Sequence, residues 1–178
     1  WTAFILIISG ITSIFYYASI GGLGEMPDLK VLENPKTNLA SEVFSSDNKT
    51  LGKYYFNDNR TPITFEELPS NMVNALIATE DERFYDHAGI DWKGTLRAFA
   101  YLGKRGGAST ITQQLARQIF VGVRSRNKIK TVLQKAQEWV IAIQLEQRYT
   151  KKEILAMYLN KYDFGYQADG VQSAAKIF

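Results

Sequence analysis

The 178-residue sequence contains no cysteine and only one histidine, His87. The absence of cysteine excludes disulfides, zinc–thiolate and iron–sulfur sites, and a thiol nucleophile. A single histidine excludes a metal cage built from several histidines. Hydrophobic residues make up 46% of the chain and only four prolines occur, which is typical of a folded domain and not of a disordered or collagen-like chain.

Acidic residues are missing from one long stretch of the chain. Residues 1–90 carry 6 Lys and Arg against 12 Asp and Glu, whereas residues 91–178 carry 15 against 6. Residues 92–137 contain no acid and these cations: Lys93, Arg97, Lys104, Arg105, Arg117, Arg124, Arg126, Lys128, Lys130 and Lys135. Such a run requires solvent or an anionic partner, for which nucleic acid, anionic lipid and a phosphate-bearing substrate are the candidates.

The start of the chain is uncharged and apolar. Residues 1–20 contain no charged residue and have aromatic residues near both ends. About 20 helical residues are required to cross a hydrocarbon core of about 30 Å. The pattern therefore predicts a transmembrane anchor over residues 1–22, in preference to a cleaved signal peptide. The acidic residues that follow favour an exit on the non-cytoplasmic side.

The rest of the chain divides into two parts. Residues 23–64 form a glycine- and proline-containing linker followed by a small β element, with strand-like runs at 41–45, 52–56 and 61–64. Residues 65–178 have helical periodicity. Helices are expected from capping residues and apolar stripes at 70–83, 91–102, 109–120, 127–147, 150–159 and 170–178, and the apolar block within the fourth predicts that it is fully buried.

Glu80 is the first candidate for a catalytic residue. It lies four residues after Leu76 and three after Ile77, which places it on the apolar stripe of its expected helix. Burial of a carboxylate raises its pKa and makes it useful as a general base or acid near neutral pH. A salt-bridged glutamate at a helix end, paired with Arg83 or Arg97, explains the spacing equally well.

Two further groups of residues are candidates for a site. Glu138 follows Lys135 by one helical turn, a spacing that by itself is more typical of a surface ion pair. A second group gathers hydroxyls, amides and free backbone N–H groups at an expected helix start, which suits binding of sugar hydroxyls or phosphate. It comprises Ser109, Thr110, Thr112, Gln113 and Gln114.

Five motifs of one known family occur in order. The first, Glu-Asp-x-x-Phe-x-x-His-x-Gly, matches residues 80–89, and the second, Gly-x-Ser-Thr-Ile-Thr-Gln-Gln, matches residues 107–114. The other three fall at 134–138, 151–160 and 170–175. With these motifs the chain resembles the peptidoglycan glycosyltransferase domain (glycosyltransferase family 51) of class A penicillin-binding proteins and monofunctional cell-wall transglycosylases.

The sequence departs from that family at a few positions. Gln134 stands where the third motif usually has Arg, and Arg117 stands where Lys is common. The segment before the fifth motif, at residues 163–167, also differs. These departures leave Glu80 and Glu138 in place, and they bear only on the phosphate contacts expected at 117 and 134.

The resemblance implies a fold and an activity. The fold would be mainly α, with a lysozyme-like helical core and a membrane-associated jaw subdomain in residues 65–178, which are truncated at their C-terminal end, beside the anchor and the small β element. The reaction would polymerise lipid II into β-1,4-linked glycan strands with inversion and release of undecaprenyl pyrophosphate. Glu80 and Glu138 would be catalytic. The residues that would bind substrate are Asp81, Phe84, His87, Ser109, Thr112, Gln113, Gln114, Arg117, Arg124, Arg126 and Lys135. Of these, one of Arg124 and Arg126 would contact the pyrophosphate, and His87 would mainly support the first motif.

The resemblance also implies partners and a location. The partners are lipid II, the growing lipid-linked glycan, the bacterial cytoplasmic membrane and other proteins of cell-wall synthesis, but no nucleic acid. The protein would cross that membrane once, with its catalytic domain on the periplasmic or extracellular face. Mg²⁺ or Mn²⁺ at the donor pyrophosphate is compatible with the reaction, although no cluster of ligands requires it and no metal-binding residue is assigned.

Two rival functions remain open at the level of sequence. A lysozyme-like lytic transglycosylase also uses a glutamate in a helical fold, but its substrate has no pyrophosphate to require the acid-free basic run. A non-enzymatic, membrane-anchored protein that binds polyanions would use the basic run and would have no need of Glu80.

Overall fold

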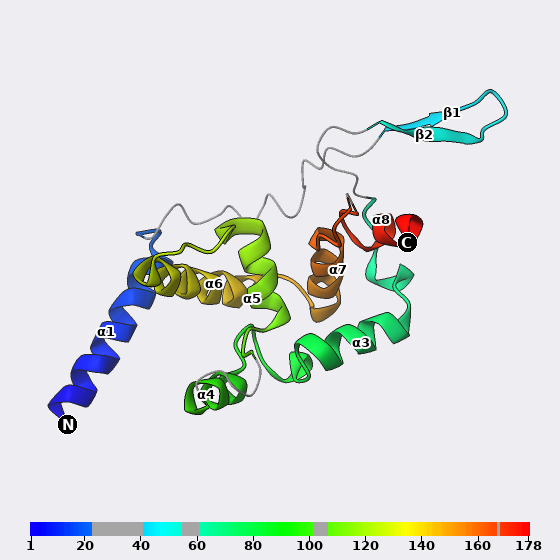
Figure 1. Cartoon of the computed structure of the whole chain (residues 1–178). Helices are drawn as coiled ribbons and strands as arrows, with labels where there is room; N and C mark the ends of the chain where they lie inside the picture. Colours follow the sequence, from blue (N-terminus) through cyan, green and yellow to red (C-terminus); the bar gives the residue numbers. More distant parts are fainter. Residues whose placement is uncertain (23–40, 55–60, 102–106, 167) are drawn as a thin grey trace.

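The computed structural model describes residues 1–22, 41–54, 61–101, 107–166 and 168–178, and these are mainly helical, as the sequence predicts (Figure 1). In chain order the elements are α1 (Thr2–Ser19), β1 (Ser41–Phe44), β2 (Thr50–Tyr54), η1 (Phe65–Glu67), α3 (Ser70–Glu80), η2 (Phe84–Asp86), α4 (Trp92–Ala100), α5 (Ile111–Ala116), η3 (Arg117–Val121), α6 (Lys128–Arg148), α7 (Lys151–Lys161) and α8 (Val171–Ile177). Three predicted features lie outside the described residues: the linker over 23–40, the strand end at 55–56 and the basic loop at 103–106, which includes Lys104 and Arg105.

The β element is a two-stranded antiparallel hairpin. β1 pairs with β2 from Ser41 opposite Tyr54 to Phe44 opposite Thr50, with an irregularity between Val43 and Phe44. Asn48 in the turn has a φ of 59°, a left-handed conformation that asparagine tolerates better than most residues. Figure 1 shows the hairpin projecting away from the helices.

The strand-like run at 61–64 does not form a strand, so of the two forms that the sequence allows, a hairpin or a trio of strands, the described residues form the hairpin. Residues 61–64 have no regular structure. The Ile63 amide donates to Asn160 Oδ1 at 3.0 Å, and Asn160 Nδ2 donates to the Ile63 carbonyl at 2.8 Å. Both backbone groups of Ile63 that a neighbouring strand would use are therefore taken by one side chain of α7.

Capping residues define the starts of the helices. Asp91 Oδ1 accepts from the Gly94 amide at 3.0 Å, and Thr110 Oγ1 accepts from the Gln113 amide at 3.1 Å. Thr150 begins α7 with a reciprocal capping box that uses Glu153. These short-range hydrogen bonds satisfy free N–H groups of the first turn, so they fix the helix starts where the sequence predicts them.

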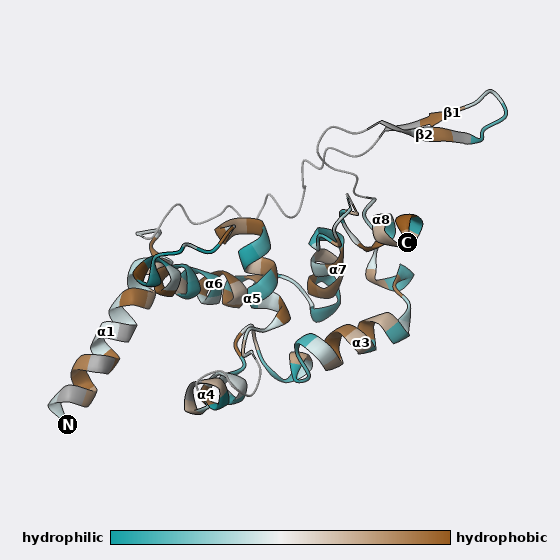
Figure 2. Ribbon diagram, in the orientation of Figure 1, coloured by the Kyte–Doolittle hydropathy of each residue, from teal (hydrophilic) through white to brown (hydrophobic). Residues whose placement is uncertain are grey.

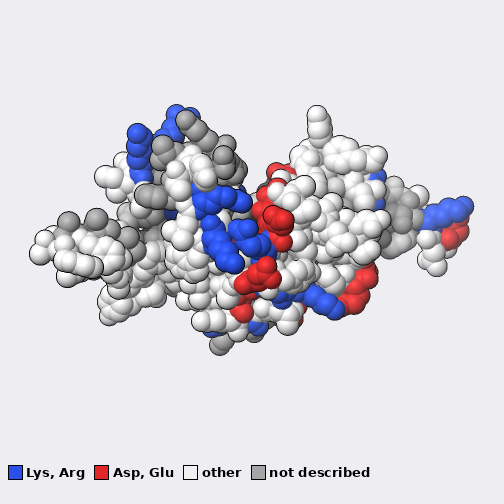
Figure 3. Space-filling view, turned by 90° about the horizontal axis from the view of Figure 1, so that it is seen from below, with Lys and Arg blue, Asp and Glu red and all other residues white. Residues whose placement is uncertain are grey.

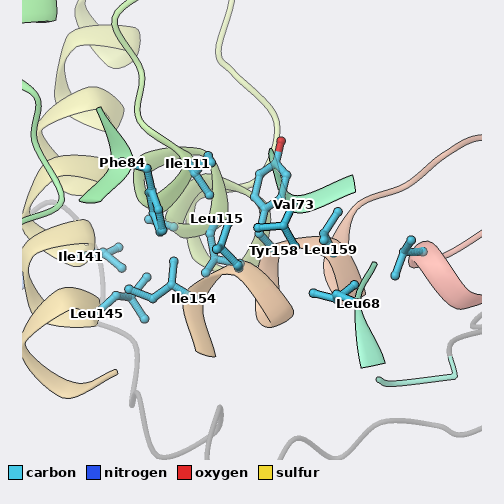
Figure 4. Close-up of a cluster of buried hydrophobic side chains, with 13 residues drawn as sticks. Leu68, Val73, Phe84, Ile111, Leu115, Ile141, Leu145, Ile154, Tyr158 and Leu159 are labelled. Carbon is cyan, nitrogen blue, oxygen red and sulfur yellow. The ribbon is translucent and has the colours of Figure 1, made fainter. Parts of the chain in front are cut away.

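The core is built around the short helix α5. Ile111 and Leu115 of α5 are fully buried and pack with side chains of α6 and α7, together with Phe84 of η2 (Figure 4). The packed partners that Figure 4 labels on α6 and α7 are Ile141, Leu145, Ile154, Tyr158 and Leu159. Because α5 is enclosed by the core, polar side chains on it are held in fixed positions.

The prediction that the fourth helix is fully buried was wrong for its first half. In α6, Ile129 and Val132 are 72% and 59% exposed, whereas the second half is buried along Glu138, Ile141 and Leu145. The buried face therefore includes Glu138 and begins only after the first two turns of the helix, with Ala136, Glu138, Val140, Ile141, Ala142 and Leu145. The elements that pack against α6 are chiefly α5 and α1.

The first helix packs on α6. Phe15 of α1 stacks on Trp139 of α6, with ring centroids 5.5 Å apart, and Ala18 is buried. Figure 2 shows apolar residues distributed along α1. The expected transmembrane anchor over residues 1–22 is not found: α1 has 18 residues, and within the described ranges no helix has the length and apolar character that a membrane crossing requires.

Candidate active site

A cavity of about 330 Å³ opens where α3 ends, between α4 and the segment that leads into α5. Figure 3 shows the face on which α3 and α4 lie, with basic side chains gathered in the middle beside a group of acidic ones. The polar residues that line the cavity are Thr79, Glu80, Asp81, Glu82, Arg83, Asp91, Arg97, Ser109, Thr110 and Gln114. Two of the predicted motifs, at 80–89 and 107–114, thus form opposite parts of one cavity wall.

Glu80 is on the cavity wall, but the prediction that it is buried was wrong. It is the last residue of α3 and is exposed, because the helix end faces the open cavity and none of the described elements covers it. Leu76 and Ile77, one turn earlier, are only partly buried. The alternative of a salt-bridged glutamate also fails, because Arg83 pairs with Asp91 and, among the described residues, no cation lies within ion-pairing distance of Glu80.

One oxygen of Glu80 is held by a chain of side-chain hydrogen bonds. Gln114 Nε2 donates to Glu80 Oε2 at 2.8 Å, and Tyr158 Oη donates to Gln114 Oε1 at 3.1 Å. Burial raises the pKa of the Tyr158 phenol well above its usual value, and the Glu80 charge adds to this effect. Tyr158 therefore stays protonated and acts as a donor, which turns the amide nitrogen of Gln114 toward Glu80.

Asp81 joins the end of α3 to the start of α5. Both of its carboxylate oxygens lie 3.1 Å from His87 Nε2, and Oδ2 also accepts from the Ile111 amide at 3.0 Å. Asp81 and His87 are nearly inaccessible to solvent. This buried link fixes the position of Glu80, the residue before Asp81, relative to Gln114 on α5.

Lys135 is bonded to the residue of α5 that precedes Gln114. Its ammonium donates to Ser109 Oγ at 2.9 Å, to Gln113 Oε1 at 3.1 Å and to Glu138 Oε2 at 2.8 Å. Burial lowers the pKa of Lys135 below its usual value, although the bond to Glu138 opposes the shift. The adjacent residues Gln113 and Gln114 thus hold the cation and the carboxylate of the site.

Glu138 is fully buried, in contrast to the surface pair that its spacing favours. One oxygen accepts from Lys135, and the other has no hydrogen-bond partner but lies 3.7 Å from Arg124 Nη2. Arg126 is exposed and makes no ion pair to any described residue. Of the two arginines that the sequence leaves open, Arg124 is therefore the one at Glu138.

Arg117 begins the π-helical turn η3 directly after α5. Its charge lowers the pKa of both Tyr158 and Lys135. Burial is the larger effect in both, and it raises the pKa of Tyr158 but lowers that of Lys135. Arg117 is thus close enough to both side chains for its charge to act on them. A π-helical turn is rare and frequently marks a functional site.

Four residues predicted to bind substrate are enclosed by protein. Thr112 is fully buried and donates to Glu146 Oε1 at 2.6 Å, and Gln113 Nε2 donates to the Gly89 carbonyl at 3.2 Å. Phe84 is in the core, and His87 contacts Asp81. In this structure they hold other residues of the site in place and present no surface to a ligand.

Three residues that the sequence did not predict to be catalytic or substrate-binding lie in or next to the site, although Arg97 was named as an alternative ion-pair partner of Glu80 and Gln134 as a departure from its motif. Tyr158 lies within the fourth motif, at 151–160, but its bond to Gln114 depends on the packing of α7 against α5. Arg97 lines the cavity, and Gln134 bonds to the backbone beside Arg124. The departure of Gln134 from its motif was the only signal available for it. Among the described residues, no group of three or more His, Cys, Asp or Glu side chains could hold a metal ion.

Comparisons with known proteins show the family to which the chain belongs. A family model described as Transglycosylase matches residues 47–178. The chain is 41% identical over 179 aligned positions to penicillin-binding protein 1A of Vibrio cholerae, which covers 98% of this chain and 21% of that protein. It is 40% identical over 158 positions to penicillin-binding protein 1A of Escherichia coli, covering 86% and 18%, and 37% identical over 180 positions to penicillin-binding protein 1F of Bacillus subtilis, covering 98% and 24%.

The chain spans about a fifth of the length of these curated relatives. Within that span the family model covers most of the chain, and it includes every residue of the cavity wall. The identities to the penicillin-binding proteins extend over nearly the whole chain. The chain therefore belongs to the transglycosylase family.

Proposed function

We propose that the chain is the catalytic part of a peptidoglycan glycosyltransferase that polymerises lipid II into β-1,4-linked glycan. The observation that carries the proposal is the arrangement on α5, where Gln114 holds the Glu80 carboxylate and the adjacent Gln113 holds the Lys135 ammonium. A transfer from a lipid diphosphate to an alcohol requires these two groups: a base for the attacking hydroxyl and cations for the departing diphosphate.

Glu80 is the general base of the proposed reaction. Its carboxylate takes the proton from the 4-hydroxyl of the acceptor GlcNAc as that oxygen attacks C1 of the donor MurNAc. The new O–C1 bond forms as the bond from C1 to the pyrophosphate oxygen breaks, and the configuration at C1 inverts. Because Glu80 is exposed in this structure, an acceptor sugar that fills the cavity would supply the desolvation that strengthens the base.

The cationic side stabilises the leaving group. Undecaprenyl pyrophosphate departs as a multiply charged anion, and Lys135, Arg117 and Arg124 are the cations gathered beside α5. Charge-assisted hydrogen bonds to phosphate oxygens, especially those from guanidinium groups, are stronger than hydrogen bonds between neutral groups. Glu138 contacts Lys135 and Arg124 and sets their positions, so Glu138→Gln should also impair turnover strongly.

Lipid-linked substrates require that the enzyme act at a membrane surface. We place the reaction on the outer face of the bacterial cytoplasmic membrane, with lipid II, the growing glycan and other proteins of cell-wall synthesis as partners. Residues 65–178 would form the glycosyltransferase domain, with a lysozyme-like core and a membrane-associated jaw. A Mg²⁺ or Mn²⁺ ion, if used, would be held mainly by the pyrophosphate, and Glu138 Oε1 is a carboxylate oxygen without a hydrogen-bond partner in this cluster.

The test is a polymerisation assay on lipid II with Glu80→Gln. Glutamine keeps the size of the side chain and the contact with Gln114 but cannot take up the proton. We expect the rate to fall by roughly 10²- to 10⁴-fold while the far-ultraviolet circular dichroism spectrum stays unchanged. Glu66→Gln, which alters an exposed glutamate outside the cavity, should leave the rate unchanged.

Three results would contradict the proposal. Polymer formed by Glu80→Gln at near the wild-type rate would remove Glu80 from the reaction. Cleavage of preformed glycan without polymer formation would favour a lytic transglycosylase. Binding of polyanions that falls steeply with salt, in a protein that does not turn over lipid II, would favour the non-enzymatic alternative.

A further inference from the structure

The amide of Gln134 bonds to the backbone on both sides of Arg124. Gln134 Oε1 accepts from the Ser125 amide at 2.9 Å, and Gln134 Nε2 donates to the Val123 carbonyl at 3.1 Å. Only a side-chain amide offers a donor and an acceptor at this spacing. Asn160 holds the two backbone groups of Ile63 in the same way, so the chain uses this arrangement twice.

Other residues of α6 fix the same segment. Thr131 Oγ1 donates to the Ser125 carbonyl at 2.9 Å, and the Asn127 amide donates to Ser125 Oγ at 3.2 Å. Residues 123–125 therefore lie along the first turns of α6, although the Val123 side chain is 94% exposed and contributes almost no packing. Hydrogen bonds from α6 hold this segment, and apolar burial does not.

The consequence concerns the direction of the Arg124 side chain. Glu138 lies four residues after Gln134, on the same face of α6, and Arg124 Nη2 lies 3.7 Å from Glu138 Oε1. An ion pair of this length to a half-exposed arginine contributes too little to order the segment by itself. The backbone must therefore be held by other bonds, and Gln134 is the side chain that bonds to it on both sides of Arg124, with Thr131 adding a bond to Ser125.

We propose that Gln134 is a positioning residue that holds Arg124 over the Lys135–Glu138 pair for binding the diphosphate of the donor. The proposal rests on the proposed function for the identity of that anion. An arginine at position 134, as the third motif usually has, offers only donors and could not accept from the Ser125 amide. Glutamine at 134 thus supplies this chain with an acceptor for the Ser125 amide in place of a further cation.

The test is a double-mutant cycle with inorganic pyrophosphate as the probe. Gln134→Met keeps the length of the side chain and removes both polar atoms, and Arg124→Gln removes the cation. Calorimetric titration should give an affinity that is lower than that of the wild type by roughly five- to tenfold for each single variant. The double variant should bind no more weakly than Arg124→Gln alone, because Gln134 acts through Arg124.

Hydrogen exchange gives a readout that is independent of activity. The Ser125 amide should exchange faster in Gln134→Met than in the wild type, because its acceptor is gone. Gln134→Arg is a second variant, in which the Ser125 amide should again exchange faster. Gln147→Met, an exposed substitution on the same helix, is the matched control and should change neither the exchange nor the affinity.

Several outcomes would overturn the inference. An unchanged affinity in either single variant would do so, and so would losses that multiply in the double variant or Ser125 exchange that stays at the wild-type rate. The Glu80→Gln assay separates these failures from failure of the proposed function. If Glu80→Gln abolishes polymerisation while Arg124→Gln binds pyrophosphate normally, the reaction stands and only the positioning of Arg124 is wrong.

Discussion

At the scale of the residue, Lys135 is the most constrained charge in the site. Its three hydrogen bonds go to Ser109, Gln113 and Glu138, which use all three protons of the ammonium. The sequence predicted the Lys135–Glu138 pair, because residues three apart on a helix are neighbours. It could not predict that the pair is buried, because burial depends on how α5 packs against α6.

The lowered pKa of Lys135 predicts a specific pH dependence. Lys135 binds an anion only when it is protonated, and its pKa is lowered from 10.5, so pyrophosphate affinity should fall with rising pH at a lower pH than an ordinary lysine would give. Arginine stays protonated over this range, so Lys135→Arg should shift the loss of affinity to higher pH. Titration calorimetry across a pH series measures this, with Lys128→Arg as the exposed control. If the affinity of the wild type and that of Lys135→Arg fall over the same pH range, a group other than Lys135 causes the loss of affinity.

At the scale of the element, α5 connects every part of the site in only six residues. Its first amide bonds to Asp81, and its side chains reach both Glu80 and Lys135. Its cap, Thr110, was visible in the sequence because capping uses neighbours along the chain. The burial of Thr112 and Gln113 could not be predicted, because the sequence shows the chemistry of a side chain but not whether a ligand or another helix faces it.

Gly89 holds α5 against α6, and its replacement should be costly. Its φ is +88°, and a Cβ there would lie 2.9 Å from the backbone of Ala142. Its carbonyl accepts from Thr110 Oγ1 at 2.7 Å. Gly89→Ala should therefore lower the free energy of unfolding by about 1–3 kcal/mol, measured by chemical denaturation. Gly107→Ala, where a Cβ would meet nothing within 4 Å, should stay close to the wild type, and equal stability of the two variants would contradict the strain assigned to Gly89.

At the scale of the whole molecule, Trp139 joins three distant segments. It stacks on Phe15 of α1 and meets Trp92 of α4 edge-on, with both centroid distances 5.5 Å. The sequence predicted most helices of the molecule, because caps and periodicity are local signals, whereas the grouping of several motifs in one site was implied only by the family resemblance. The sequence did not predict this contact, and it treated residues 1–22 as separate from the helical domain, because contacts between distant segments leave no periodic pattern.

The contact between α1 and α6 should contribute to stability. Phe15→Ala removes the stacked ring and should lower the free energy of unfolding by about 1–2 kcal/mol. Thermal unfolding followed by circular dichroism would measure the change. Phe4→Ala alters an exposed phenylalanine on the same helix whose ring contacts Trp1, and it should have a smaller effect. If both variants unfold at the same temperature, the packing of α1 on α6 does not stabilise the molecule.

The hydrogen-bond chain from Tyr158 to Glu80 makes the two carboxylate oxygens inequivalent. Since the phenol keeps its proton, the Gln114 amide has a single orientation, and its nitrogen always faces Oε2 of Glu80. Oε2 is thereby engaged, whereas Oε1 accepts no hydrogen bond from any described residue. In the proposed reaction Oε1 is therefore the oxygen that would take the proton from the acceptor hydroxyl, and the orientation of Gln114 would select which oxygen of Glu80 acts as the base.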